Sequence, residues 1–220
     1  MVTIVGLLIS PVIFLALFFY LKYKFPGGGF DLLFRAFIWG CIIAIPVIIA
    51  DQVAHYLQID GARSIRRMIV YSFVVVAFVS EISKFLPLRL SIVKRNRFSG
   101  PNPGIHYSVA VALGLATIYA VYHAYFSARS GADTVYYLSI GPMNAVLGII
   151  MGFFLGMGKL RKNLFIDSMT GLAATIFFHG IYRFTLLTSD ITLFWLFVTG
   201  TFFIAAILVF KSRKATADSY

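Results

Sequence analysis

Ionisable and polar side chains occur inside apolar stretches that are long enough to be membrane-spanning helices. An ionisable group at the centre of a bilayer costs about 2.5–3.5 kcal/mol on insertion scales, so each such residue is a candidate for function. The candidates are Asp51, His55, Glu81, Lys84, Tyr119, His123, Asn144, His179 and Arg183. Their spacing decides which chemistry they can share.

Eight of these candidates fall into pairs that share one face of a helix. Side chains three or four residues apart are neighbours on a helix surface. The pairs are Asp51 with His55, Glu81 with Lys84, Tyr119 with His123, and His179 with Arg183. A histidine and a carboxylate from different helices can bind Zn²⁺, and a metal-bound water can attack a peptide carbonyl with a carboxylate as general base. The pattern therefore permits a hydrolytic metal site, with Glu81 and His179 as ligands.

Each pair also has a structural interpretation. Opposite charges at Glu81 and Lys84 can simply neutralise each other, and polar side chains in a bilayer also form interhelical clamps. Aromatic and histidine rings can be packing residues, and an arginine near the end of a span can extend to the interface. The interhelical clamp is the structural interpretation for Asp51 with His55, and ring packing is that for Tyr119 with His123. Extension to the interface is that for Arg183.

The predicted depth of the two metal candidates disfavours a shared metal. Glu81 lies about three residues from mid-span on one side, and His179 lies about three or four residues from mid-span on the other. At a rise of about 1.5 Å per residue, this separates them by about 10 Å along the membrane normal.

The composition requires an integral membrane protein. Of the 220 residues, 60% are hydrophobic and 12% are charged, whereas soluble domains average about 45–50% and about 25%. A membrane helix needs about 20 predominantly apolar residues. Seven such runs predict an all-α polytopic bundle in one transmembrane domain, 1–220, with a tail at 211–220; the runs are roughly 2–21, 36–59, 68–88, 107–128, 135–158, 164–187 and 191–210.

Basic residues are distributed unevenly between the two sets of connections. One set carries thirteen, at Lys22, Lys24, Arg35, Arg89, Lys94, Arg95, Arg97, Lys159, Arg161, Lys162, Lys211, Arg213 and Lys214; the other carries four, at Arg63, Arg66, Arg67 and Arg129. The positive-inside rule then predicts the N-terminus outside and the C-terminus inside. This sorting accounts for most of the net charge of +11 without a nucleic-acid partner, and no nucleic-acid motif is present.

Four segments, in order, resemble the motifs of the PrsW-type intramembrane proteases, relatives of the CAAX-processing membrane proteases. Residues 78–85, FVSEISKF, are similar to the family's Glu-Glu-x-x-Lys segment, and residues 100–119 to the loop and helix that carry Phe-x-x-x-Glu. Residues 141–156 and 173–184 are similar to the next helix and to the His-x-x-x-Asp helix. The resemblance covers about 68–187. It implies catalytic positions at Glu81, Lys84 and His179, a Zn²⁺ cofactor if the site is active, and a bacterial or archaeal cytoplasmic membrane.

The sequence also departs from these motifs. Ser80 stands in place of the first glutamate, Tyr119 in place of the second motif's glutamate, and Arg183 in place of the aspartate; Asn144 stands where another family histidine is expected. Two readings follow. Either the chain is an active peptidase with a rearranged site that uses Glu81, His179, His123 and Asp51, or it keeps the fold, has lost the chemistry, and binds or holds a membrane partner.

Two other classes of membrane protein are open on the sequence. Intramembrane charges can line the ion path of a transporter, although no duplicated half is present. A structural subunit of a membrane complex is the other class. Gly148, Gly152 and Gly156 form a double G-x-x-x-G ridge, which serves either close packing within the bundle or contact with a second copy.

Overall fold

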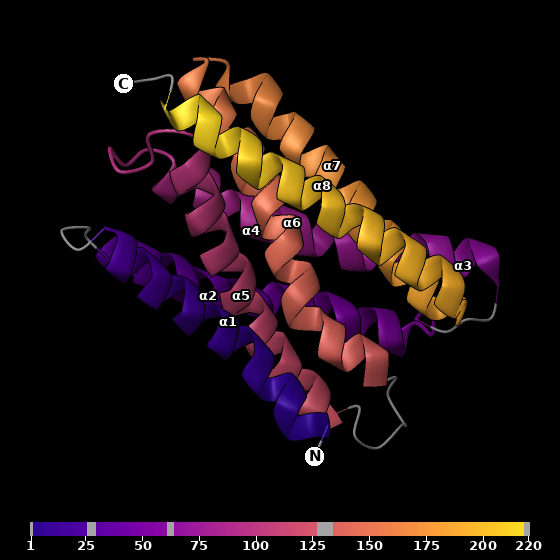
Figure 1. Ribbon diagram of the computed structural model, residues 1–220. Coiled ribbons are helices and arrows are strands. Elements are labelled where there is room, and N and C mark those ends of the chain that lie inside the picture. Colours follow the sequence, from indigo (N-terminus) through magenta and orange to yellow (C-terminus); the bar gives the residue numbers. More distant parts are fainter. Residues whose placement is uncertain (1, 26–29, 61–63, 127–133, 218–220) are drawn as a thin grey trace.

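The computed structural model describes residues 2–25, 30–60, 64–126 and 134–217, and this part of the chain is helical without any strand (Figure 1). The single-helix spans are α1 (Val2–Lys24), α2 (Asp31–Tyr56), α5 (Pro101–Phe126), α6 (Thr134–Leu160), α7 (Leu164–Leu187) and α8 (Ile191–Ala217). The third span is built from α3 (Ile65–Val70), η1 (Tyr71–Phe78), α4 (Val79–Pro87) and η2 (Leu88–Ile92). Seven segments are long and apolar enough to cross a membrane, which confirms the predicted all-α polytopic bundle.

Some sequence features concern residues that are not described. Arg63, Arg129 and the glycine run 27–29 lie outside the described residues, as does the end of the tail, 218–220. Helix α8 continues to Ala217, so the first residues of the predicted tail are helical. The side of the membrane that each terminus faces stays a prediction.

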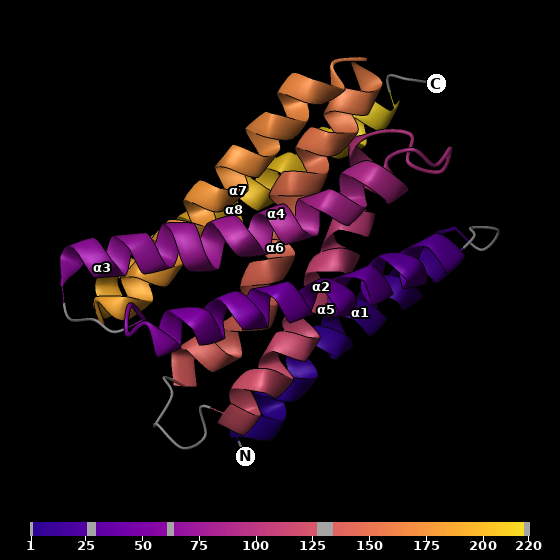
Figure 2. The ribbon, with the colours of Figure 1, turned by 180° about the vertical axis from the view of Figure 1, so that it is seen from behind.

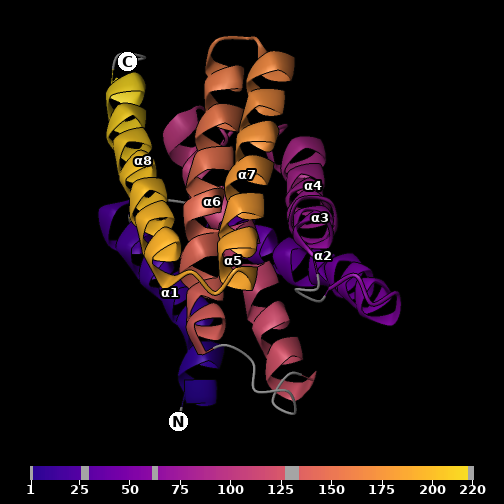
Figure 3. The ribbon, with the colours of Figure 1, turned by 90° about the vertical axis from the view of Figure 1, so that its right-hand side faces the viewer.

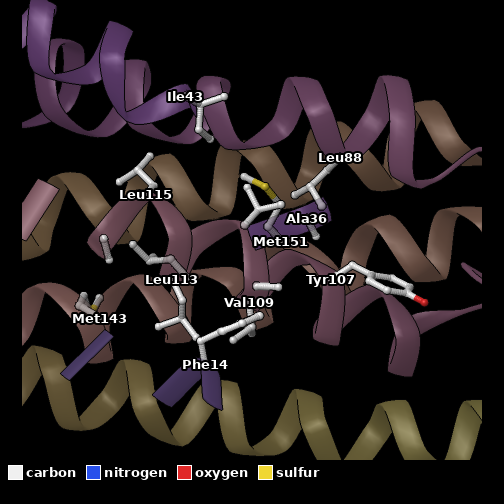
Figure 4. Close-up of a cluster of buried hydrophobic side chains, with 14 of the residues drawn as sticks. Phe14, Ala36, Ile43, Leu88, Tyr107, Val109, Leu113, Leu115, Met143 and Met151 are labelled. Carbon is white, nitrogen blue, oxygen red and sulfur yellow. The ribbon is translucent and has the colours of Figure 1, made fainter. Parts of the chain in front are cut away.

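Helices α5 and α6 form the centre of the bundle. Both α1 and α2 pack against α5 on one side, and α7 and α8 pack against α6 on the other (Figures 1 and 3). Residues 110–113 of α5 have no exposed surface, and Figure 4 shows Leu113 and Leu115 of α5 among side chains from neighbouring helices. Large apolar side chains on α1 and α8 are exposed instead, as expected for surfaces that face lipid.

Glycines allow the central helices to approach each other closely. A Cβ atom on Gly114 of α5 would collide with the backbone carbonyl of Phe37 in α2, and one on Gly152 of α6 would collide with the backbone of α5 at Gly104. Close backbone approach at small residues is the usual way in which membrane helices pack. The neighbours on the ridge, Gly148 and Gly156, are buried against α5 in the same way.

The ridge packs within the bundle, which is one of the two interpretations of the G-x-x-x-G pattern. An oligomer contact through Gly148, Gly152 and Gly156 would need this face of α6 to be free, but α5 of the same chain covers it. The alternative interpretation, close packing within the bundle, is what the structure has.

The boundaries of the longest connection differ from the prediction. The apolar run 107–128 places the start of this helix near 107, but α5 begins at Pro101 and η2 extends to Ile92. Proline is tolerated in the first turn of a helix because its missing N–H has no intrahelical partner there. Pro101 and Pro103 therefore begin the helix, and the connection is limited to 93–100.

Two π-helical stretches interrupt the third span. One, η1, leads into α4, and the other, η2, follows Pro87, whose ring nitrogen has no hydrogen to donate. The hydrogen bond from the Val93 N–H to the Leu88 carbonyl, 2.8 Å, closes a wider turn of this kind. Local π adjustments let membrane helices satisfy backbone groups around proline, and π turns are frequent at functional sites.

Replacement of Gly152 by leucine is expected to destabilise the bundle strongly, because the new side chain would occupy the position of the α5 backbone at Gly104. Overpacking of a dense core costs about 1–3 kcal/mol or more. The matched control is Gly200→Leu on α8, where an added Cβ has no neighbour within 4 Å. Thermal unfolding in detergent should show a lowered transition only for Gly152→Leu, and equal transitions for both variants would contradict the packing described.

Candidate functional site

A carboxylate, an ammonium group and an imidazole meet in the interior of the bundle. Glu81 has no exposed surface, Lys84 is 1% exposed and His179 is 6% exposed. Lys84 Nζ donates to Glu81 Oε1 at 2.6 Å, and His179 Nδ1 lies 2.6 Å from the same oxygen. The Glu81–Lys84 ion pair expected from the sequence is present, and Glu81 also contacts His179, which the predicted depths had disfavoured.

Helix crossing brings Glu81 and His179 together although they are at different positions along their helices. Figure 2 shows α3 and α4 running obliquely across α7. The phenyl ring of Phe73, in η1, lies where a Cβ of Gly180 would be, so the glycine next to His179 permits this crossing. The expected separation of about 10 Å is thus wrong, because it assumed helices parallel to the membrane normal.

Lys84 connects α4 to α6. Besides Glu81 in α4, its ammonium group donates to Asn144 Oδ1 on α6 at 3.1 Å. The Asn144 amide in turn donates to the carbonyl of Ile140 at 2.9 Å, which fixes the orientation of the amide. We call Glu81, Lys84, His179 and Asn144 the polar centre. Glu81 Oε2 is buried and has no hydrogen-bond partner among the described residues.

A small cavity of about 20 Å³ adjoins the polar centre. Space of this size holds about one water molecule. Its polar lining comes from Ser80, Tyr119, Tyr136, Asn144, His179 and Tyr182. Ser80, Tyr119 and Asn144 are three of the positions where the sequence departs from the PrsW-type motifs, so these departures are neighbours in space.

Arg183 belongs to a second polar cluster, one turn along α7. Its guanidinium carbon lies 4.1 Å from the centroid of the Tyr136 ring and 5.4 Å from that of Tyr71. The Tyr71 hydroxyl donates to Asp51 Oδ1 at 2.6 Å and accepts from Arg183 Nη2 at 3.4 Å. The alternative in which Arg183 extends to the membrane interface is therefore wrong: cation–π contacts hold the side chain between helices.

Three other candidates lie apart from the polar centre. His55 is exposed and pairs with Asp60, at 2.7 Å between Nδ1 and Oδ2, rather than with Asp51. His123 packs its ring against the rings of Tyr119 and Tyr136, at centroid distances of 4.6 and 5.2 Å. The clamp that Asp51 forms is interhelical, as that interpretation predicted, but its partner is Tyr71 instead of His55.

Sequence reasoning missed the tyrosines of the site. Tyr71, Tyr136 and Tyr182 are buried and contact Arg183, Asp51 or the cavity, yet aromatic residues are common throughout the spans. Tyr182 also forms a 2.6 Å hydrogen bond with Ser139 on α6. The one available signal was position, because Tyr182 lies between His179 and Arg183 on α7. Nothing in the sequence distinguished Tyr71 or Tyr136 from tyrosines that only pack.

The residues of the polar centre do not fit a catalytic zinc ion. Such sites use about three protein ligands and one open position. Within the described residues, no group of three histidine, cysteine, aspartate or glutamate side chains could hold a metal. Glu81 and His179 supply two ligands at most, and the ammonium group of Lys84 is bonded to the carboxylate oxygen that faces the histidine.

Comparison with known proteins places the chain in a family. Residues 28–210 match the model of the PrsW family intramembrane metalloproteases. The chain is 24% identical over 200 residues to the protease PrsW of Geobacillus kaustophilus, covering 90% of this chain and 84% of that relative. It is 26% identical over 194 residues to the protease PrsW of Bacillus subtilis, covering 84% of both chains, and 28% identical over 166 residues to that of Clostridioides difficile, covering 70% and 67%.

No solved structure matches the chain. The family model covers most of the sequence, including every residue of the polar centre and of the cluster around Arg183. The serial order of motifs, the bundle of seven apolar helices and this match agree, and the chain belongs to the PrsW family of intramembrane metalloproteases.

Proposed function

We propose that this protein keeps the PrsW fold but does not hydrolyse peptide bonds with a metal, and that it acts by binding a transmembrane segment of another membrane protein. The observation that carries the first part is that Glu81, paired with Lys84 as in the family's Glu-Glu-x-x-Lys segment, lacks the family's other carboxylates, which Ser80, Tyr119 and Arg183 replace. A carboxylate that neutralises a buried ammonium group is a structural counter-ion. Here Glu81 Oε1 already accepts a hydrogen bond from the Lys84 ammonium group.

Electrostatics support this reading. Two unit charges about 4 Å apart interact by about 4 kcal/mol at an effective dielectric constant of about 20. A divalent ion on Glu81 Oε1 would meet the Lys84 ammonium at comparable range and would be repelled by about twice that energy. Arg183, one helical turn from His179, adds a second cation on the same helix.

The departures from the family motifs remove the remaining ligands. Ser80 and Tyr119 line the cavity beside His179 where the family motifs carry carboxylates, and neither is charged. Arg183 stacks on tyrosine rings at the position of the third acid. What is left is a neutralised polar centre that joins α4, α6 and α7.

The partner-binding surface that we propose is an apolar crevice between α6, α7 and α8. Its volume is about 310 Å³, and its walls include Pro142, Met143, Phe194, Trp195 and Val198. Tyr182 lines both this crevice and the cavity at the polar centre. Only the Tyr182 side chain would separate a transmembrane segment in this crevice from His179. A membrane substrate would therefore reach the polar centre from the side of the crevice. Since the relatives compared are bacterial, we place this protein in a bacterial membrane.

The active alternative has one observation in its favour. Glu81 Oε2 has no hydrogen-bond partner among the described residues, and the neighbouring cavity has room for a water molecule next to His179. A carboxylate and a histidine beside a water molecule can carry out general acid–base chemistry. Cleavage of a membrane substrate by the wild type, abolished in Glu81→Gln, would favour this alternative over the proposal.

Zinc content tests the loss of metal chemistry. The purified protein, equilibrated with zinc and then desalted, should retain far less than one zinc ion per chain, and His179→Ala should not lower the value. The protease PrsW of Bacillus subtilis, treated identically, is the positive control. His55→Ala controls for adventitious binding by an exposed histidine. One zinc ion per chain, lost in His179→Ala and kept in His55→Ala, would overturn the proposal.

Glu81→Gln should destabilise the protein, since it leaves the Lys84 ammonium group buried without its counter-ion. Breaking a buried ion pair in this way costs about 3–5 kcal/mol. The double variant Glu81→Gln/Lys84→Met should recover most of the loss. Thermal unfolding in detergent measures both effects, and an unchanged transition in Glu81→Gln would show that the ion pair does not support the bundle.

Site-specific photo-crosslinking in native membranes tests the crevice. A photoreactive amino acid at Trp195, which lines the crevice, should give one discrete adduct whose crosslinked peptide is identified as a transmembrane segment. The neighbouring position Leu196 is 73% exposed and does not line the crevice, so it is the matched control. The same adducts at both positions, or adducts with lipid alone, would contradict the proposed surface.

A further inference from the structure

A second, larger groove lies away from the polar centre, between α1 and α8. Its volume is about 400 Å³, within the range of about 300–1,000 Å³ that is common for sites of small ligands. Helices α5 and α6 contribute Ile105, Val109 and Ile149, and α1 and α8 contribute Leu17 and Val209. None of the residues of the polar centre lines this groove, so it is a separate site.

Both cations of the groove come from the last turns of the helices that border it. Lys24 ends α1, and Arg213 is in the last turn but one of α8. Both side chains line the same groove as His106 of α5. No acidic side chain lines the groove, and neither Lys24 nor Arg213 has an ion-pair partner within the described part of the chain.

Further groups at this end favour an anion. Asn102, in the first turn of α5, lines the groove and provides an amide donor. The Tyr20 hydroxyl lies 3.4 Å from Lys24 Nζ and borders the same space. The groove therefore has a cationic, hydrogen-bonding end and apolar walls.

We propose that this groove binds one anionic phospholipid, with the phosphate group between Lys24 and Arg213 and an acyl chain along the apolar walls. An apolar transmembrane segment would leave Lys24 and Arg213 without an anionic partner. Basic pockets between membrane helices are known to hold anionic lipid headgroups. A free phosphate ion would use the cationic end but leave the walls without a ligand.

Native mass spectrometry of the full chain tests this assignment. The detergent-solubilised protein is titrated with phosphatidylglycerol and, separately, with phosphatidylcholine of the same acyl chains. One phosphatidylglycerol molecule should bind with clear preference over phosphatidylcholine. The double variant Lys24→Gln/Arg213→Gln should weaken that binding about thirtyfold, given about 1 kcal/mol for each basic residue near an anionic lipid surface.

Two further variants separate charge from shape. Lys22→Gln/Lys214→Gln removes the same charge from exposed residues next to the groove, outside its lining, and should bind phosphatidylglycerol as the wild type does. Ala16→Trp fills the apolar part, and should weaken phosphatidylglycerol binding without any change of charge. Circular dichroism and size-exclusion chromatography confirm that each variant is folded.

Three outcomes would overturn the proposal. The first is equal binding of the two lipids, which would show that the cations do not select an anion. The second is an equal loss in Lys22→Gln/Lys214→Gln, which would indicate attraction by overall charge. The third is complete displacement of the lipid by millimolar inorganic phosphate, which would identify a site for the free anion.

Discussion

The ion pair between Glu81 and Lys84, both buried inside the bundle, constrains how three helices are arranged. Each charge alone would be costly in a bilayer, so the pair must be completed by neighbours: His179 on the glutamate and Asn144 on the lysine. These contacts come from α4, α6 and α7. The same four side chains therefore define where three helices cross, and fix the position of the cavity beside them.

The ion pair with Lys84 also bears on our proposal that the site does not use a metal. A carboxylate in a bundle can serve as the counter-ion of a cation or as the ligand of a metal, but the same oxygen serves both poorly. Here the carboxylates of the other family motifs are replaced by Ser80, Tyr119 and Arg183, which cannot take over the second role. The Arg183 guanidinium packs on the Tyr136 ring and contacts Tyr71, whose hydroxyl donates to Asp51. These groups, and not His179, are the partners of its charge.

Sequence patterns predicted the parts of the structure that depend on local periodicity. Apolar runs gave seven spans because a bilayer imposes a minimum length, and the spacing of Glu81 and Lys84 gave their ion pair. The contact between Glu81 and His179 was not predicted by depth, because helix tilt is set by packing, here by Gly180 against Phe73. The hydrogen bond from Tyr71 to Asp51 and the pairing of His55 with Asp60 depend on which helix or loop lies opposite each residue. Sequence periodicity carries no information about these tertiary neighbours.

The central claim is that Glu81 is the counter-ion of Lys84 and not the ligand of a metal. An experimental structure of the wild type in a lipid bilayer with saturating zinc, with anomalous scattering recorded at the zinc edge, tests it most directly. We expect Lys84 Nζ on Glu81 Oε1, His179 Nδ1 on the same oxygen, and no anomalous density between Glu81 and His179. An anomalous peak joining Glu81 to His179, with Lys84 turned away, would contradict it.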